Sequence, residues 1–145
     1  MRIQGAVARP IELQAPELAA LADTEVVADF RCHEGWSRVG VRWRGVRLAA
    51  LLSLAGASDG AGYVTVASGD YTVVLSREQA EDRRVLLALE RDGRPLRVAD
   101  GVPRLVGPAD WDCFTSVKAV QRIEVTREPA EATAARIALG RLEGG

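Results

Sequence analysis

The residues best suited to chemistry lie in one short stretch, Phe30 to Ser37, which reads Phe-Arg-Cys-His-Glu-Gly-Trp-Ser. Cys32 follows a predicted strand and enters a glycine-containing loop, where the backbone can approach a ligand closely. A thiolate is the soft, charged ligand that a redox metal selects. Cys32 is therefore a candidate metal ligand, although a single cysteine at a strand end is more often a small buried side chain.

Other metal and nucleophile chemistry finds little support. His33 is the only histidine, so no multi-histidine metal site or histidine relay is available. A zinc site made from Cys32, His33 and Cys113 lacks the paired ligand spacing of such sites. We expect His33 to lie at the surface or behind the ligand, because neighbouring strand residues point to opposite faces. The sequence contains no Ser/His/Asp, P-loop or dinucleotide-binding motif.

The apolar pattern predicts the elements that must position Cys32. A strand over Glu25–Phe30 precedes it, and the alternation of Val39, Val41 and Trp43 predicts a second strand after it. Leu48–Ala55 is predicted to be a helix that ends at Gly56 in a left-handed cap.

Further elements follow from capping, turn and periodicity signals. They are a helix over Pro16–Leu21, strands over Tyr63–Val66 and Tyr71–Leu75, a short helix beginning at Ser76–Gln79, strands over Val85–Glu90 and Pro95–Val98 around an Asp92-Gly93 turn, and a final strand over Val117–Thr126. Many short strands with a few short helices predict a single compact α+β domain over residues 1–127. We expect residues 128–145 to form a helical or partly ordered tail.

Composition limits the class of protein. The 145 residues carry a net charge of −1, so no global field favours nucleic acid or an anionic membrane. No apolar run approaches the roughly 20 residues that span a bilayer, and the first residues show no export signal. We therefore expect a cytoplasmic protein whose two cysteines are free thiols or ligands rather than a disulfide. Lys118 is the only lysine in a chain that otherwise uses arginine.

The order of several motifs resembles one family. Residues 32–37 read Cys-x-Glu-Gly-Trp-Ser, and residues 42–48 read Arg-Trp-x-Gly-Val-x-Leu before a Leu-Leu helix. This pattern resembles the molybdenum-ligand segment of the sulfite-oxidase-type molybdopterin-binding family. The similarity continues over residues 3–127, through the segments 70–72, 86–88, 92–96, 101–106, 116–118 and 122–125. The resemblance implies a sulfite-oxidase-like molybdopterin-binding fold and molybdenum-molybdopterin as cofactor.

The resemblance also implies site residues. Cys32 is similar to the family's catalytic thiolate ligand of molybdenum, and Ser68 lies where the family places a hydroxyl near the pterin. Arg104 matches an arginine near the cofactor. The segment that holds the phosphate end corresponds to Cys113, Phe114, Thr115, Ser116 and Lys118. A phosphate favours arginine, lysine, hydroxyl and backbone N–H donors, which agrees with this assignment. A solvated strand lysine and a core-filling Cys113 are the alternatives.

Two functions remain open at this stage. The first is a molybdenum oxidoreductase for a small oxyanion or sulfoxide-type substrate, which passes electrons to or from a separate carrier. Arg38, Arg42 and Arg44 could attract an oxyanion, although we interpret at least two of them as ordinary exposed strand residues. The second is a non-catalytic or degenerate module, or a subunit of a larger redox complex. It is favoured by residues 113–115, where the family usually has Gly-aromatic-Lys.

The tryptophans near Cys32 also have two interpretations. Both can pack in the core beneath the loop, or Trp36 can line the mouth of the pocket. For Trp43 we predict a core position, because it alternates with Val39 and Val41.

Overall fold

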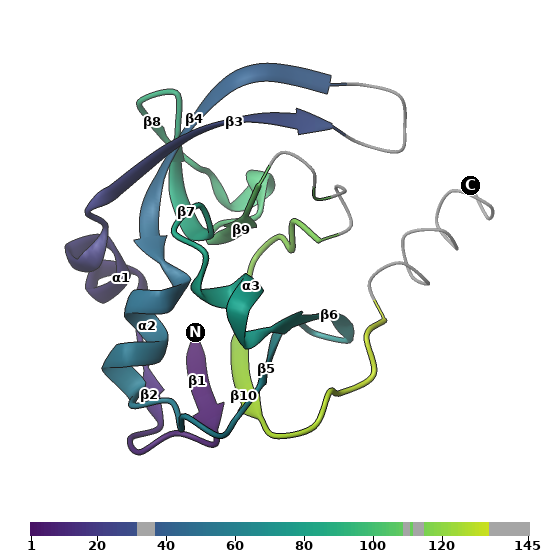
Figure 1. Cartoon of the computed structure of the whole chain (residues 1–145). Coiled ribbons are helices and arrows are strands. Elements are labelled where there is room, and N and C mark those ends of the chain that lie inside the picture. The colour runs from purple at the N-terminus through teal and green to yellow at the C-terminus, as the bar shows by residue number, and fades with distance from the viewer. Residues whose placement is uncertain (32–36, 109–110, 112–114, 134–145) are drawn as a thin grey trace.

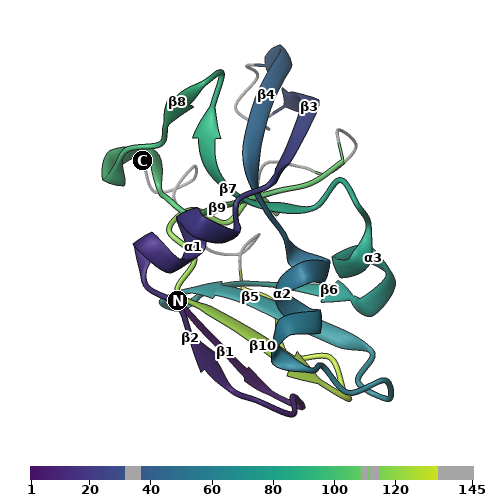
Figure 2. The ribbon, with the colours of Figure 1, turned by 90° about the vertical axis from the view of Figure 1, so that its left-hand side faces the viewer.

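Two five-stranded sheets make up the fold. The structure is a computed structural model that describes residues 1–31, 37–108, 111 and 115–133, with the side chains of residues 29–31 and 37–39 excepted. Figure 1 shows the first sheet in the lower half of the molecule and the second sheet in the upper half, and the turned view in Figure 2 shows the same two layers. Among the described residues, every helix is too short or too polar to span a bilayer.

The first sheet brings the two ends of the domain together. Its order is β2 (Ile11–Glu12), β1 (Arg2–Gly5), β10 (Arg122–Thr126), β5 (Tyr63–Ser68) and β6 (Tyr71–Ser76). The pair β1–β10 is parallel, and the other pairs are antiparallel. The first and last strands of the domain are therefore neighbours in the same sheet.

The second sheet contains the strands on either side of Cys32. Its order is β3 (Thr24–Arg31), β4 (Ser37–Arg47), β7 (Leu86–Arg91) and β8 (Arg94–Pro95), and β9 (Arg104–Val106) also pairs with β7. All of these pairs are antiparallel. β7 is therefore the strand that joins the Cys32 hairpin to β9.

Three short helices connect the strands within the part of the chain that the structure describes. They are α1 (Ala15–Leu21), α2 (Leu48–Ala55) and α3 (Arg77–Glu81), and a single 3-10 turn, η1, spans Val98–Asp100. Gly56 ends α2 with φ of 71°, as the left-handed cap predicts. At α3 the Gln79 amide donates to Ser76 Oγ at 3.1 Å and the Ser76 amide donates to Gln79 Oε1 at 2.9 Å, which confirms the capping box.

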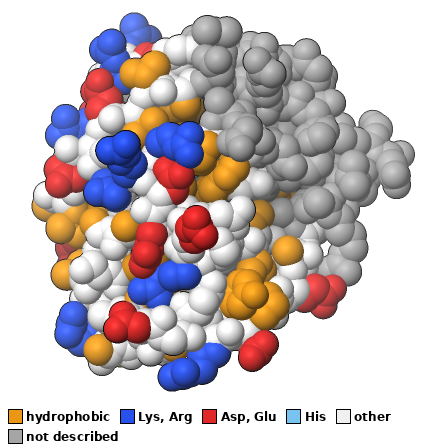
Figure 3. Space-filling model, in the orientation of Figure 1, with side chains coloured by type: hydrophobic (Ala, Val, Ile, Leu, Met, Phe, Trp, Pro, Cys, Tyr) orange, Lys and Arg blue, Asp and Glu red, His pale blue; other side chains and the backbone are white. Residues whose placement is uncertain are grey.

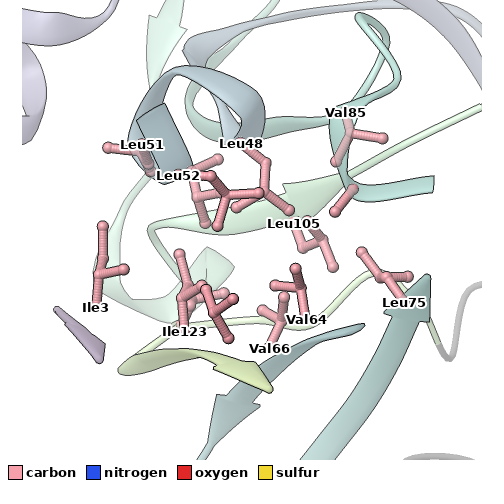
Figure 4. Packing of buried hydrophobic residues seen from close by; sticks show 14 of the residues in the cluster. Ile3, Leu48, Leu51, Leu52, Val64, Val66, Leu75, Val85, Leu105 and Ile123 are labelled. Atoms are coloured by element: carbon pink, nitrogen blue, oxygen red, sulfur yellow. The ribbon is translucent and has the colours of Figure 1, made fainter. Parts of the chain in front are cut away.

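The main core lies between the sheets and beneath α2. Figure 4 shows Leu48, Leu51 and Leu52 of α2 above Ile3, Ile123, Val64 and Val66 of the first sheet, with Leu105 of β9 beside them. All of these side chains are at most 1% exposed. Removing an aliphatic side chain of this size from water contributes roughly 1.5–3 kcal/mol. This core holds the two sheets in one unit.

A second apolar cluster covers the opposite face of the second sheet. It contains Val41, Trp43, Leu86, Ala88, Leu96 and Val106. Trp43 is 2% exposed, so its predicted core position is confirmed.

Most predicted elements are present, but two predicted strands have different bounds and some short strands were not predicted. The strand predicted over Val117–Thr126 begins only at Arg122. The strand predicted over Pro95–Val98 is limited to Arg94–Pro95, because the chain turns into η1 at Val98. β9 was not predicted at all, since three residues give too short an alternation to detect.

The chain beyond residue 127 is bonded to the edge strand β6. Thr72 Oγ1 donates to the Glu131 carbonyl at 3.2 Å, and the Thr133 amide donates to the Thr72 carbonyl at 3.0 Å. Thr133 Oγ1 donates to the Asp70 carbonyl and accepts from the Thr72 amide at 2.9 Å. These bonds cover backbone groups that an edge strand otherwise leaves open. The helix predicted in the tail lies outside the described residues, and the domain boundary at residue 127 stays a prediction.

We predict that Thr72→Val lowers the free energy of unfolding by about 1–3 kcal/mol, because the Glu131 carbonyl and Thr133 lose their hydroxyl partner. Thr65→Val is the matched control. Thr65 is 5% exposed in the same sheet, and its Oγ1 has no hydrogen-bond partner among the described residues, so this change is expected to be neutral or stabilising. Urea denaturation measures the free energy of unfolding of both variants. Equal destabilisation contradicts a stabilising role for the hydrogen bonds between Thr72 and residues 131–133.

Candidate functional site

Backbone hydrogen bonds bring β9 beside the segment 115–120. The Leu105 amide donates to the Val117 carbonyl at 2.9 Å, and the Val120 amide donates to the Pro103 carbonyl at 2.9 Å. The Ala119 amide donates to the Gly101 carbonyl at 2.8 Å. Arg104 therefore lies on a strand directly alongside the chain that carries Thr115, Ser116 and Lys118.

Gly101 sets the position of Lys118. The φ of Gly101 is 79°, and a Cβ built there would lie 2.4 Å from Lys118 Cβ. Glycine is therefore required both for the left-handed backbone and for the close approach. The Lys118 side chain is exposed and forms no ion pair with any residue that the structure describes. Its ammonium is available to an anion.

Arg104 is buried and points away from the main core. Arg104 is 7% exposed, and the neighbouring Leu105 is 0% exposed and packs in the main core. Because successive strand residues point to opposite faces, Arg104 points away from that core. The Arg104 Cζ lies 5.7 Å from the centroid of the Trp43 ring. Burial and the neighbouring Arg91 guanidinium lower the pKa of Arg104, and the Asp100 carboxylate acts in the opposite direction. The group remains a cation at neutral pH, because arginine begins from a very high pKa.

Ser68 lies at the end of β5, next to the same region. The Gln121 amide donates to the Ala67 carbonyl at 2.9 Å, and the Gly69 amide donates to Gln121 Oε1 at 2.9 Å. The turn after Ser68 is thus hydrogen-bonded to Gln121, the residue directly before β10 and three residues after Lys118. The contact of Ser68 with the pterin stays a prediction.

The remaining predicted site residues are not described. β3 ends at Arg31, directly before Cys32, and β4 begins at Ser37, so a strand does lead into the cysteine as predicted. Cys32 itself, Cys113 and Phe114 lie outside the described residues, as do His33 and Trp36. Within the described part of the chain, no group of three or more His, Cys, Asp and Glu side chains could hold a metal ion.

Arg42 and Arg44 of β4 form ion pairs, whereas the side chain of Arg38 lies outside the described residues. Arg42 Nε lies 3.3 Å from Glu25 Oε1, and Arg44 Nε lies 3.3 Å from Glu90 Oε2. Arg44 also donates to the Ala22 carbonyl at 3.0 Å. Their charges are locally neutralised, which favours the interpretation of both as ordinary exposed strand residues. Figure 3 shows basic and acidic side chains interspersed over the described part of this face.

Sequence reasoning missed the contact between Trp43 and two arginines. Arg91 Cζ lies 5.9 Å from the Trp43 ring centroid, on the same tryptophan that Arg104 approaches. Arg91 Nη2 also lies 3.8 Å from Asp100 Oδ1. The tryptophan was assigned to the core correctly, but its arginine neighbours come from other strands. No local signal could have found them.

The family model for the oxidoreductase molybdopterin binding domain matches residues 1–134. The chain belongs to this family. Its members are oxidoreductases, and their cofactor is molybdenum-molybdopterin. The match agrees with the resemblance seen over residues 3–127.

Two curated relatives are similar over most of the chain. The uncharacterized oxidoreductase YuiH of Bacillus subtilis (strain 168) is 32% identical over 130 residues, which cover 88% of this chain and 65% of YuiH. The protein-methionine-sulfoxide reductase catalytic subunit MsrP of Campylobacter jejuni is 29% identical over 150 residues, covering 90% of this chain and 50% of MsrP. The chain thus spans only half to about two-thirds of these relatives.

A solved structure shows the same fold. The sulfane dehydrogenase SoxCD from Paracoccus pantotrophus matches with a TM-score of 0.82 and 24% identity, over 92% of this chain and 39% of that chain. The similarity confirms the sulfite-oxidase-like molybdopterin-binding fold that the sequence predicted.

The described donors fit the phosphate end of this cofactor. A buried guanidinium, an exposed ammonium and two hydroxyls occur on adjacent segments, at Arg104, Lys118, Thr115 and Ser116. These are the groups that a phosphate prefers. The close approach of Gly101 to Lys118 is the backbone constraint that holds part of this set in place.

We predict that Gly101→Ala destabilises the protein by more than the about 1–2 kcal/mol cost of a left-handed alanine, because the new methyl group collides with Lys118. Gly93→Ala is the matched control: its φ is 80° and nothing lies within 4 Å of the added Cβ. Urea denaturation is expected to show the larger loss for Gly101→Ala. Equal losses mean that Gly101 contributes backbone conformation alone.

Proposed function

We propose that the chain is a molybdenum-molybdopterin-dependent oxidoreductase that acts on a small oxyanion or sulfoxide-type substrate, with Cys32 as the thiolate ligand of molybdenum. The observation that carries the proposal is the alignment of β9 with the segment 115–120, which places Arg104 beside Ser116 and Lys118. Family membership supports the cofactor, and the name of MsrP supports the sulfoxide alternative.

Each residue has a separate role in this proposal. Arg104, Ser116 and Lys118 bind the phosphate end, and Cys113, Phe114 and Thr115 belong to the same cofactor-binding segment. Ser68 contacts the pterin from the end of β5. Bound molybdenum supplies two-electron redox or oxygen-atom chemistry. Cys32 holds the metal, because a thiolate is the soft ligand that such a metal selects.

Electrons reach the site through a separate carrier in this proposal. The sequence carries no haem-binding or second redox motif within its 145 residues. The substrate is a small molecule that enters beside Cys32. Neither Arg42 nor Arg44 is assigned to it, since each already pairs with a glutamate.

A second candidate is a non-catalytic or degenerate module of the same fold. Residues 113–115 read Cys-Phe-Thr where the family usually has Gly-aromatic-Lys, so one cation of the phosphate site is replaced by a threonine.

Metal and pterin content distinguish these functions. Protein expressed in a host that makes the cofactor is expected to contain molybdenum, measured by elemental analysis, and pterin, measured by fluorescence after oxidation. Cys32→Ser is expected to remove metal-dependent activity and leave the circular dichroism spectrum unchanged, because a hydroxyl is a far poorer soft-metal ligand of similar size. If Cys32→Ser keeps the molybdenum content and turnover of the wild type, Cys32 is not the metal ligand. If the wild-type protein contains neither molybdenum nor pterin, the non-catalytic module is supported instead.

We predict that Lys118→Ala lowers cofactor affinity about ten- to hundredfold, because one charge-assisted phosphate contact is lost. Molybdenum per chain is expected to fall, while KM of the molecules that remain loaded stays near the wild-type value. Activity must therefore be normalised to bound molybdenum.

Arg83→Ala is the control for this prediction. It removes one exposed cation in the connection between α3 and β7, outside the segments 101–106 and 115–120, and is expected to leave molybdenum content unchanged. Full occupancy of Lys118→Ala with a markedly raised KM places Lys118 at the substrate instead of the phosphate.

A further inference from the structure

Trp43 contacts arginines from two other strands. It lies on β4 with 2% of its surface exposed, while Arg91 belongs to β7 and Arg104 to β9. The two guanidinium carbons lie 5.9 and 5.7 Å from the ring centroid, within the range of a cation–π interaction. One indole therefore links three strands of the second sheet.

Small residues make this reach across the sheet possible. Gly45 of β4, Ala88 of β7 and Arg104 of β9 are partners in consecutive strands. Ala88, the β7 partner of Arg104, has only a methyl group, so no bulky β7 side chain stands between Arg104 and β4 at this position. Gly45 cannot be larger, because a Cβ there would lie 2.0 Å from the Leu87 carbonyl oxygen.

A bulge in β7 brings Arg91 to the same face. Gly45 pairs with Ala88 and Arg44 pairs with Glu90, so Leu89 is an extra residue in β7. Beyond the bulge Arg91 lies directly opposite Trp43. Arg91 and Arg104 then approach the same ring as like charges, and Arg91 Nη2 lies 3.8 Å from Asp100 Oδ1.

The ring face restrains the Arg104 guanidinium. A planar guanidinium stacks on an aromatic face and loses little further freedom when it then binds a phosphate. The Arg91 guanidinium repels the same group, and the contact with the ring opposes its displacement.

We propose that Trp43 is a positioning residue that holds the Arg104 guanidinium in the orientation that binds the phosphate end of the cofactor. The inference rests on the proposed function of Arg104. Trp43 would then have a role beyond core packing. It would affect cofactor binding only by orienting Arg104.

A double-mutant cycle on the loaded protein tests this role through the rate of pterin release. Trp43→Leu is expected to accelerate release roughly five- to thirtyfold, the range of a desolvated cation–π contact. Arg104→Gln is expected to accelerate it at least as much. Trp43→Leu is expected to add no further acceleration in the Arg104→Gln background, because its effect passes through the guanidinium. Trp43→Phe retains an aromatic face and is expected to restore most of the slow release.

Arg91→Gln provides the matched control, since it removes the other guanidinium over the same ring. Trp43→Leu is expected to keep its full effect in the Arg91→Gln background. Equal acceleration by Trp43→Leu with and without Arg104 overturns the positioning role and assigns Trp43 to core packing. Unchanged release in Arg104→Gln overturns both this role and the proposed function of Arg104.

A second cycle needs no cofactor. The same four proteins, freed of cofactor, are compared by their midpoints of urea denaturation, with near-ultraviolet circular dichroism to confirm a packed core. Contact between Trp43 and Arg104 predicts that the two midpoint shifts are not additive, whereas additive shifts contradict the contact itself. If Trp43→Leu does not fold, Trp43→Met, which also lacks an aromatic face, takes its place in both cycles.

Discussion

The alternation of three residues in β9 is the constraint on which the candidate site depends. Leu105 is fully buried in the main core, and strand geometry then directs Arg104 to the opposite face of the second sheet. Leu105 also supplies the amide that binds the Val117 carbonyl, which draws the segment 115–120 alongside. Burial of one leucine thus fixes both sides of the proposed phosphate site. A change of register by one residue would place Arg104 in the apolar core and separate it from Trp43.

β7 connects β9 to the hairpin that leads to Cys32. It pairs with β4 on one side and with β9 on the other. Its bulge at Leu89 reverses which residues face Trp43, so Ala88 and Arg91 both lie on the tryptophan side. The irregular strand is therefore part of the architecture of the site. A regular β7 would turn Arg91 to the other face.

Local signals predicted the elements, whereas the site depends on contacts between distant residues. The bounds of α2 and its cap at Gly56 followed from sequence because helical periodicity and a glycine stop are local. β9 and the start of β10 at Arg122 could not be predicted, since tertiary pairing sets those ends. Arg104, Ser116 and Lys118 were grouped only through the family resemblance. Their adjacency depends on hydrogen bonds between segments more than ten residues apart, such as Leu105 to Val117.

Three arginines of the second sheet differ in exposure and in their charged neighbours. Arg42 and Arg44 are exposed, and each faces a glutamate at 3.3 Å, an arrangement that contributes little stability and leaves little net charge for a distant anion. Arg104 is buried, and the effect of its charge is strengthened because little water surrounds it. Arg104 therefore differs from Arg42 and Arg44 in burial and in the strength of its field. In the proposed function, this difference favours Arg104 over the two exposed arginines as the group that meets the phosphate end of the cofactor.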